Sequence, residues 1–133
     1  MGHLVQYHKV WEQGSPFVGE RPFVFAKNSP QKRSLALQAE KDRDRIWLIY
    51  RNVPTDTVYR VAFTFLATEV AVNEDQIKIF GDDVLLPSSL TLCRARTPWF
   101  NDFMERNGRF AFGLREVPPE FSAHFDSLLA GIT

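Results

Sequence analysis

The sequence predicts an α+β fold in which a curved, mostly antiparallel sheet from the N-terminal two-thirds is packed by two short C-terminal helices. Three observations support this prediction. Residues 58–67 alternate between apolar and polar side chains, as a strand with one buried face does. Apolar segments before residue 96 are joined by short turn-forming stretches, which favours antiparallel pairing. Beyond residue 96 the apolar residues recur at helical spacing.

Four strands are predicted ahead of this alternating segment, at residues 4–11, 23–26, 34–38 and 45–51. The first two end at stretches rich in Gly, Ser, Asn and Pro, which interrupt regular structure. The strand at 45–51 is a continuous apolar run between charged ends, so we expect it to lie centrally in the sheet. Residues 40–44 are all charged and form the predicted connection before it, with a short helical turn as the alternative.

The segment 58–72 is the strongest strand prediction. The side chains expected on its apolar face are Tyr59, Val61, Phe63, Phe65 and Ala67. Some apolar positions also fit helical spacing, but β-branched and aromatic side chains pack better on a pleated sheet. A turn at 73–75 leads into a strand at 76–80, which Gly81, Asp82 and Asp83 are expected to end. Residues 90–96 form the last predicted strand.

Two helices are predicted, at residues 97–107 and 119–130, and both should cover one face of the sheet. Thr97 is a typical N-cap residue, Pro98 suits the first helical position, and Gly108 follows the apolar stripe. Pro118 and Pro119 begin the second helix in the same way. The side chains expected to be buried in this fold are Trp47, Phe63, Phe65, Phe103 and Phe125.

Composition favours one globular domain over residues 1–133. A hydrophobic fraction of 44% with twelve Phe residues is enough for a core that needs no disulfide or structural metal. Cys93 is the only cysteine, which rules out an internal disulfide and fits a reducing compartment. The chain has no apolar run of membrane-spanning length and no signal-peptide pattern, so a soluble, cytoplasmic protein is expected. His3 is interpreted as part of a terminal remnant without function.

The sixteen basic and sixteen acidic residues are unevenly distributed. Residues 1–60 hold ten Lys and Arg against six Asp and Glu, and residues 61–133 hold six against ten. Attraction between the two halves within one fold explains this asymmetry better than a nucleic-acid partner, because nucleic-acid-binding domains are usually basic overall. Basic residues such as Arg21 and Lys27 alternate with Phe23 and Phe25, and such a set could stack bases and neutralise phosphates. Aromatic residues in apolar strand runs are normally in the core, however, so Phe23 and Phe25 are expected there and nucleic-acid binding is the minority hypothesis.

Motifs for metal binding or catalysis are scarce. The histidines form no close pair, Cys93 has no nucleophile signature around it, and neither a phosphate-binding glycine loop nor a hydrolase elbow occurs. The acidic residues around 74–83 suggest the only enzymatic candidate, because Mg²⁺ prefers carboxylate oxygens. The catalytic candidates from this cluster are Asp75 and Asp83, and the resemblance described next adds Asp56 and Lys78.

Asp56, Gln76 and Lys78 loosely resemble the core of the restriction-endonuclease-like nucleases. In that family a carboxylate and a later acidic or Gln residue bind metal, and a Lys two positions further on assists the attacking water. The resemblance implies these roles for the three residues. It covers only them, has Gln where the family usually has an acidic residue, and lacks the expected flanking helices, so the chain is not assigned to the family.

The leading hypothesis is a non-enzymatic binding or protein-interaction module that needs no cofactor or metal. We expect it to bind a protein partner or a second copy of itself, through an apolar patch near the C-terminal helices. The residues predicted to form this patch are Trp99, Phe103, Phe110, Phe121 and Arg109. One alternative is a metal-dependent nuclease or phosphodiesterase-type enzyme. Another is a protein with an aromatic cavity for a small apolar ligand; neither a nucleic acid nor a membrane is an expected partner.

Overall fold

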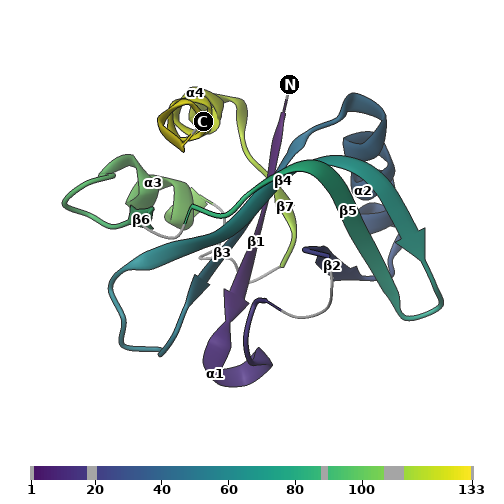
Figure 1. The fold of residues 1–133 in the computed structure, drawn as a ribbon, viewed down its shortest axis with the longest axis horizontal. Coiled ribbons are helices and arrows are strands. Elements are labelled where there is room, and N and C mark those ends of the chain that lie inside the picture. Colours follow the sequence, from purple (N-terminus) through teal and green to yellow (C-terminus); the bar gives the residue numbers. More distant parts are fainter. Residues whose placement is uncertain (1, 18–20, 88–89, 107–112, 133) are drawn as a thin grey trace.

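A computed structural model describes residues 2–17, 21–87, 90–106 and 113–132. The strands are β1 (His3–Lys9), β2 (Val24–Lys27), β3 (Arg45–Arg51), β4 (Tyr59–Val72), β5 (Gln76–Leu85), β6 (Thr91–Leu92) and β7 (Arg115–Glu116). The helices are α1 (Val10–Gln13), α2 (Pro30–Asp42), α3 (Trp99–Arg106) and α4 (Pro119–Ile132). A seven-stranded sheet runs in the order β2-β5-β4-β3-β1-β7, with β6 paired to β4. Figure 1 shows how strongly β4 and β5 bend, and the predicted fold class is confirmed.

Pairing in the sheet is antiparallel except between β1 and β3, which run parallel. The predicted antiparallel pairing therefore holds for β3 with β4 and for β4 with β5, and the central position of β3 is confirmed. The parallel pair β1 and β3 is the exception in this mostly antiparallel sheet. These two strands are separated in sequence by α1, β2 and α2, and this long connection returns the chain to the same end of the sheet.

Helix α2 replaces the strand predicted at 34–38 and most of the connection predicted at 40–44. Ser29 caps the helix by accepting a hydrogen bond from the Lys32 backbone N–H at 3.2 Å, and Pro30 occupies the first helical position. Ala36 and Ala39 face the sheet and are fully buried. The strand prediction was wrong because a cap followed by Pro begins a helix here, and the small alanines let it pack closely.

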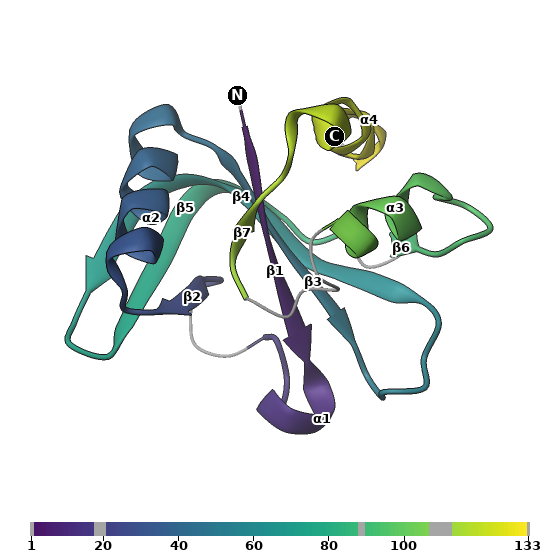
Figure 2. The same ribbon diagram turned by 180° about the vertical axis from the view of Figure 1, so that it is seen from behind.

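The two C-terminal helices are confirmed as α3 and α4, and both pack against the same face of the sheet. Figure 2 shows them on the opposite side of the molecule from α2. The strand predicted at 90–96 is reduced to two residues, which form β6. None of the helices in the described ranges combines the length and apolarity needed to cross a membrane.

One extra residue in β4 changes which way its side chains face. Leu48 pairs with Phe63 and Ile49 with Val61, so Ala62 is a bulge residue without a partner on β3. Val61 consequently packs with α3 and α4, whereas Phe63 and the residues beyond it pack on the side of α2. The predicted single stripe from Tyr59 to Ala67 is therefore wrong, because the alternation is interrupted at the bulge.

The sheet separates two hydrophobic cores. The α2 core contains Leu4, Val24, Ala26, Ala36, Ala39, Ile46, Leu48, Ala62, Phe63, Phe65, Ala67, Ile77, Ile79 and Leu114. The α3–α4 core contains Val5, Tyr7, Trp47, Ile49, Val61, Leu92, Phe100, Phe103, Val117, Phe121 and Phe125. All five side chains predicted to be buried lie in these two cores, which confirms that prediction.

Strand β5 continues past Gly81, where the sequence predicted its end. The register against β4 shifts here, and Gly81 lies opposite Ala67. A Cβ atom at position 81 would lie 1.7 Å from the Leu66 carbonyl oxygen, so no larger residue fits without moving the backbone. Gly81 thus permits the close approach of β5 to β4 and does not terminate the strand.

His3 is fully buried between the sheet and α4. Trp47 donates a hydrogen bond from Nε1 to His3 Nδ1 at 3.0 Å, which leaves Nε2 to donate to Asp126 Oδ1 at 2.7 Å. The ring also packs against Phe125 at a centroid distance of 5.7 Å. These contacts join β1, β3 and α4, so the interpretation of His3 as a remnant without a role was wrong.

Gln6 links β1 to β2, although the two strands are not neighbours in the sheet. Its side-chain amide donates to the Phe25 carbonyl at 2.8 Å and accepts from the Phe25 N–H at 3.1 Å. The buried amide therefore pairs with Phe25 as a backbone unit of a neighbouring strand would. This pair of hydrogen bonds holds the edge strand β2 against β1 and keeps the curved sheet partly closed on itself.

Truncation of Phe65 should reveal how much stability the α2 core supplies. Phe65 is fully buried, so we expect Phe65→Ala to lower the free energy of unfolding by about 3 to 5 kcal/mol, through lost burial and a residual cavity. Urea unfolding measures this change. Phe17 is 58% exposed and provides the matched control, for which Phe17→Ala should cost less than about 0.5 kcal/mol. A loss below about 1 kcal/mol for Phe65→Ala would contradict the packing described.

Candidate functional site

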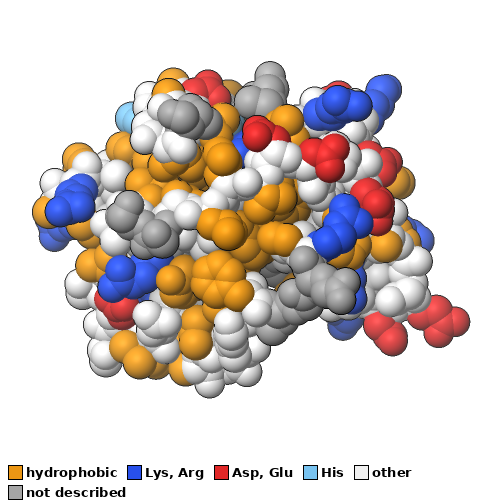
Figure 3. All heavy atoms as spheres, viewed as in Figure 1, with side chains coloured by type: hydrophobic (Ala, Val, Ile, Leu, Met, Phe, Trp, Pro, Cys, Tyr) orange, Lys and Arg blue, Asp and Glu red, His pale blue; other side chains and the backbone are white. Residues whose placement is uncertain are grey.

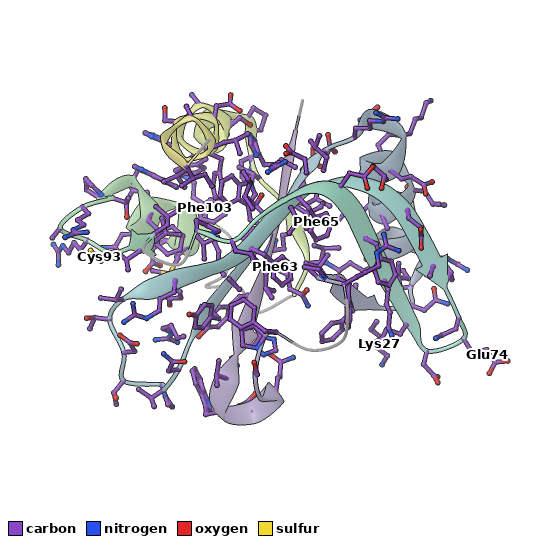
Figure 4. All side chains as sticks on the ribbon, in the orientation of Figure 1. Lys27, Phe63, Phe65, Glu74, Cys93 and Phe103 are labelled. Atoms are coloured by element: carbon purple, nitrogen blue, oxygen red, sulfur yellow. The ribbon has the colours of Figure 1, made fainter. Side chains whose placement is uncertain are left out.

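A cleft of about 350 Å³ opens where the turn between β3 and β4 (residues 52–58) meets β6 and α3. We call it the Arg51 cleft. It is lined by Arg51, Pro54, Thr55, Asp56, Thr57, Tyr59, Leu92, Cys93, Arg94, Phe100, Asn101 and Met104. Figure 1 shows the three elements together at one side of the molecule, and Figure 4 shows Cys93 there, far from Lys27.

Local hydrogen bonds hold the two walls of the cleft in place. On one wall, the Asp56 carboxylate accepts from the Val58 N–H at 3.0 Å, which shapes the turn between β3 and β4. On the other, the Thr97 hydroxyl accepts from the Cys93 N–H at 2.9 Å and donates to the Cys93 carbonyl at 3.0 Å. This closed loop leads directly into α3, whose Phe100 N–H bonds to the Thr97 carbonyl at 2.9 Å.

The guanidinium of Arg51 is fixed by hydrogen bonds and by aromatic rings. Its Nε donates to the Tyr7 hydroxyl at 2.6 Å, and its Nη1 donates to the carbonyls of Pro54 at 3.2 Å and Asp56 at 3.1 Å. The guanidinium carbon lies 4.8 Å from the ring centroid of Tyr59, and 5.5 Å from those of Tyr7 and Trp11. Among the described residues, no carboxylate forms an ion pair with Arg51. The charge is therefore held in a preformed position by neutral groups.

Burial raises the pKa of the Tyr7 phenol above its usual value of 10.0, although the hydrogen bond and the positive charge of Arg51 act in the opposite direction. Tyr7 is only 8% exposed, and its ring also packs on Tyr59 at 5.5 Å. The phenol is thus neutral at physiological pH, and its oxygen serves as an acceptor for Arg51.

The cleft combines cationic, polar and apolar groups. Arg51 and Arg94 provide positive charge. Asp56 is the one carboxylate among the described lining residues, and it already accepts a backbone hydrogen bond. Asn101 adds an amide, and Leu92, Phe100 and Met104 are among the apolar residues. Such a set suits a ligand that carries both a negative group and an apolar portion. Comparison with protein-family models, curated proteins and solved structures found no match for this chain.

The four catalytic candidates do not meet in one place. Asp56 lies in the Arg51 cleft, ahead of β4, whereas Asp75 lies in the turn after β4 and Lys78 lies on β5 just beyond it. The first and last residues of the nuclease-like trio therefore flank opposite ends of β4. Asp83 lies near the other end of β5. Within the described ranges, no three His, Cys, Asp or Glu side chains are grouped as a metal site would need.

Asp83 is committed to a structural contact. The buried Arg45 donates to its carboxylate at 3.0 Å and to its backbone carbonyl at 3.1 Å. Arg45 Nε also donates to the Thr64 hydroxyl at 3.0 Å, and this hydroxyl donates to the Ile46 carbonyl at 2.7 Å. Asp83 adopts a left-handed conformation with φ of 54°. In this conformation its carboxylate Oδ2 and its backbone carbonyl oxygen both accept from Arg45. The contact satisfies a guanidinium that is only 1% exposed.

Two of the five predicted binding residues are turned inward. Phe103 is fully buried and Phe121 is 6% exposed, both in the α3–α4 core. Trp99 is half-buried and stacks on His124 at a centroid distance of 4.7 Å. Phe110 and Arg109 lie outside the described residues. Figure 4 shows Phe103 pointing from α3 toward the sheet, so a partner can contact this side chain only if the core opens.

Large apolar side chains are exposed elsewhere. Those in the described ranges are Phe17, Leu37, Val53, Val72, Val84 and Leu86. Figure 3 shows apolar side chains across the middle of one face of the molecule. None of the exposed ones in these ranges belongs to α3 or α4, on which Trp99 is half-buried. The apolar patch near these helices and self-association through it stay predictions.

Sequence reasoning missed the aromatic surroundings of Arg51. Tyr7 and Trp11 come from the N-terminal segment and Tyr59 from the start of β4, and only the parallel pairing of β1 with β3 brings them together. Arg51 itself was visible in the sequence as a cation at the end of the apolar strand 45–51. Its partners were not, because the sequence predicted no pairing partner for the first strand.

Tyr7 should ionise only above pH 10, because burial disfavours the phenolate. The difference in absorbance near 295 nm between the wild type and Tyr7→Phe follows this one tyrosine among three. A phenol whose pKa is raised on folding contributes stability that is complete below pH 10.0, the unfolded value, and is lost as the pH rises through the folded value. Titration at or below pH 10 would contradict the burial of Tyr7.

Replacing Asp83 distinguishes a structural role from metal binding. Asp83→Asn removes the charge opposite the buried Arg45, but the Asp83 side chain is 60% exposed, so solvent screens part of the effect. We expect unfolding to become easier by about 1 to 2 kcal/mol without any metal. The exposed neighbour provides the control, since Asp82→Asn should change stability by less than about 0.5 kcal/mol. A Mg²⁺-dependent rise in Tm that disappears only in Asp83→Asn would instead support the nuclease alternative.

Proposed function

We propose that this protein is a non-enzymatic binding module that takes a small ligand, with one anionic group and an apolar portion, in the Arg51 cleft. The observation that carries the proposal is the fixed guanidinium at this cleft. Arg51 is held by three hydrogen bonds and three aromatic rings, with no carboxylate among the described residues to neutralise it. A preorganised and uncompensated charge binds an anion with little loss of side-chain entropy.

The donors of Arg51 define where the negative group binds. Nε and Nη1 are engaged by Tyr7, Pro54 and Asp56, whereas Nη2 donates to no described residue. Guanidinium groups bind carboxylates and phosphates through strong, charge-assisted hydrogen bonds. Arg94 lines the same cleft and is exposed, so it can move to close over the bound anion. A carboxylate or a phosphate is therefore the expected anionic group.

The remainder of the cleft favours an apolar or aromatic body on the ligand. Leu92, Phe100 and Met104 supply apolar contacts, and Asn101 can hydrogen-bond to one polar substituent. The volume of about 350 Å³ lies near the lower end of the range for small-molecule sites. These features support a compact ligand of the size of a substituted aromatic acid. The nuclease alternative and binding to a protein partner remain predictions from the sequence.

The experiment compares benzoate, phenyl phosphate and benzamide, the last of which matches benzoate in shape but is neutral. We expect at least one of the anions to shift the NMR signals of residues around the cleft, and benzamide to bind about ten times more weakly or not at all. Arg94→Met should weaken the anion by about tenfold or more, because a charge-assisted contact is lost. Isothermal titration calorimetry measures the affinities.

Arg96→Met is the matched control, since Arg96 is exposed and does not line the cleft. It should leave the affinity unchanged. Arg51→Met should abolish anion binding, and its Tm must be reported because Arg51 also braces the turn between β3 and β4. Equal binding of benzamide and benzoate, or an anion affinity unaffected by both Arg94→Met and Arg51→Met, would overturn the proposal.

A further inference from the structure

Three phenylalanines on β2, β5 and the segment before β2 belong to neither hydrophobic core. They are Phe23, Phe25 and Phe80, and each is half-buried. The Phe23 ring lies 6.4 Å from that of Phe25 and 5.7 Å from that of Phe80, between centroids. The rings therefore form a continuous aromatic surface. Phe23 and Phe25 were expected in the core, and this expectation was wrong because both rings lie outside the two cores.

The register of β2 and β5 explains why these rings face outward. Val24 pairs with Ile79 and Ala26 with Ile77, and all four side chains lie in the α2 core. Side chains alternate along a strand, so the intervening residues of both strands point to the opposite face. Helix α2 lies behind β5 in Figure 1 and in front of it in Figure 2, so it covers one side of this strand, and α3 and α4 lie at the other side of the molecule.

Cations lie directly on this surface. Lys78 Nζ is 4.9 Å from the ring centroid of Phe23, and the guanidinium carbon of Arg21 is 4.6 Å from that of Phe80. Lys27 is exposed at the end of β2. We call these residues, Arg21, Phe23, Phe25, Lys27, Lys78 and Phe80, the aromatic–cation face. Arg21 contacts Glu69 at 3.4 Å, whereas Lys27 and Lys78 form no ion pair with a described carboxylate.

The surface is also hollowed beside one ring. Phe25 and Lys27 line a hollow of about 410 Å³ beside the turn between β4 and β5, which Asn73, Asp75 and Gln76 border. A flat group can enter this hollow against Phe25, with Lys27 at its margin. A second hollow, of about 470 Å³, is also lined by Phe25 and Lys27 but is shared with Lys32 of α2 and Leu114 of the α2 core, so it lies toward the α2 side of β2 and is not counted in the aromatic–cation face.

We propose that the aromatic–cation face binds single-stranded nucleic acid. Any base has a flat face that can stack on an aromatic ring, and Lys or Arg side chains can neutralise the phosphates. The cationic groups now resting on the rings are attached to flexible stems, so a base can displace Lys78 from Phe23 while its ammonium moves to the adjacent phosphate. A duplex hides the faces of its bases and cannot use the rings. From the sequence, nucleic-acid binding was the minority hypothesis, because the aromatic residues were expected in the core. The pairing of β2 with β5 brings residues 21–27 and 78–80 onto one face.

Fluorescence anisotropy with labelled dT12 and U12 tests the proposal. At 50 mM salt, we expect the wild-type protein to bind at least one of them with a Kd below about 100 µM. Replacing two rings, in Phe23→Leu/Phe25→Leu, keeps apolar side chains but removes stacking, and should weaken binding by about tenfold or more. Lys78→Gln should reduce the slope of log K against log salt by about 0.7, the value for one lost phosphate contact on a single strand.

Three comparisons make the result decisive. A duplex of the same length should bind about ten times more weakly, because its bases are already stacked. Phe17→Leu and Lys41→Gln change an exposed aromatic ring and an exposed lysine outside the face, and should leave affinity unchanged. Should the double variant lose its fold, as judged by Tm, Phe80→Leu alone takes its place. Binding of duplex as tight as of single strand, or an affinity unaffected by loss of the rings, would overturn the inference.

The inference does not depend on the Arg51 cleft. Figure 4 shows Cys93, which lines that cleft, and Lys27 of the aromatic–cation face on opposite sides of the molecule. Arg51→Met should therefore leave the affinity for dT12 and U12 unchanged, and Phe23→Leu/Phe25→Leu should leave the affinity for benzoate unchanged. If one of the two proposals fails, the other can still be tested on the same set of variants.

Discussion

The bulge at Ala62 is the constraint on which the rest of the structure depends. It reverses the faces of β4 between Val61 and Phe63, so that one 14-residue strand contributes to two cores on opposite sides of the sheet. Without the bulge, Phe63 and Phe65 would lie on the same side as Val61, where α3 and α4 already supply aromatic rings. Bulges also increase the local twist and bend of a strand. This bulge and the register shifts between β4 and β5 accompany the curvature of β4 (Figure 1), along which the Arg51 cleft lies near one end and the aromatic–cation face near the other.

Buried polar contacts hold the curved sheet in one arrangement. Arg45 joins β3 to Thr64 on β4 and to Asp83 on β5, and His3 joins β1 to Trp47 and to α4. Gln6 performs the same task between β1 and β2. Each of these groups is costly to bury without a partner, and no side-chain N or O atom buried in the described residues is left without one. Hydrophobic packing alone tolerates slippage between strands, whereas these contacts are directional and fix the register.

The strands β3 and β4 and the helices α3 and α4 were predictable because their signals are local: a continuous apolar run, an alternation, and Pro next to a capping residue. Helix α2 carries the same signal in Ser29 and Pro30, but the apolar positions between Ser34 and Gln38 also fit a strand, and the period was misjudged. The parallel pairing of β1 and the bulge in β4 have no local signal, because they depend on which strands meet. The contacts around Arg51 and the arrangement of rings around Phe23 were therefore not predicted from the sequence.

The charge asymmetry of the sequence acquires a physical explanation from the ion pairs. Arg21 with Glu69 and Arg45 with Asp83 each join a basic residue of the first 60 positions to an acidic residue of the remainder, which supports the expected attraction between the two halves. These ion pairs neutralise only part of the excess positive charge of residues 1–60. Lys27 and Arg51 have no described acidic partner, and both lie where aromatic side chains leave the cores and reach a hollow of the surface. A cation that no described carboxylate neutralises is available to attract an anion. The positions of these two cations, more than the total charge, therefore identify the surfaces at which an anionic ligand is expected.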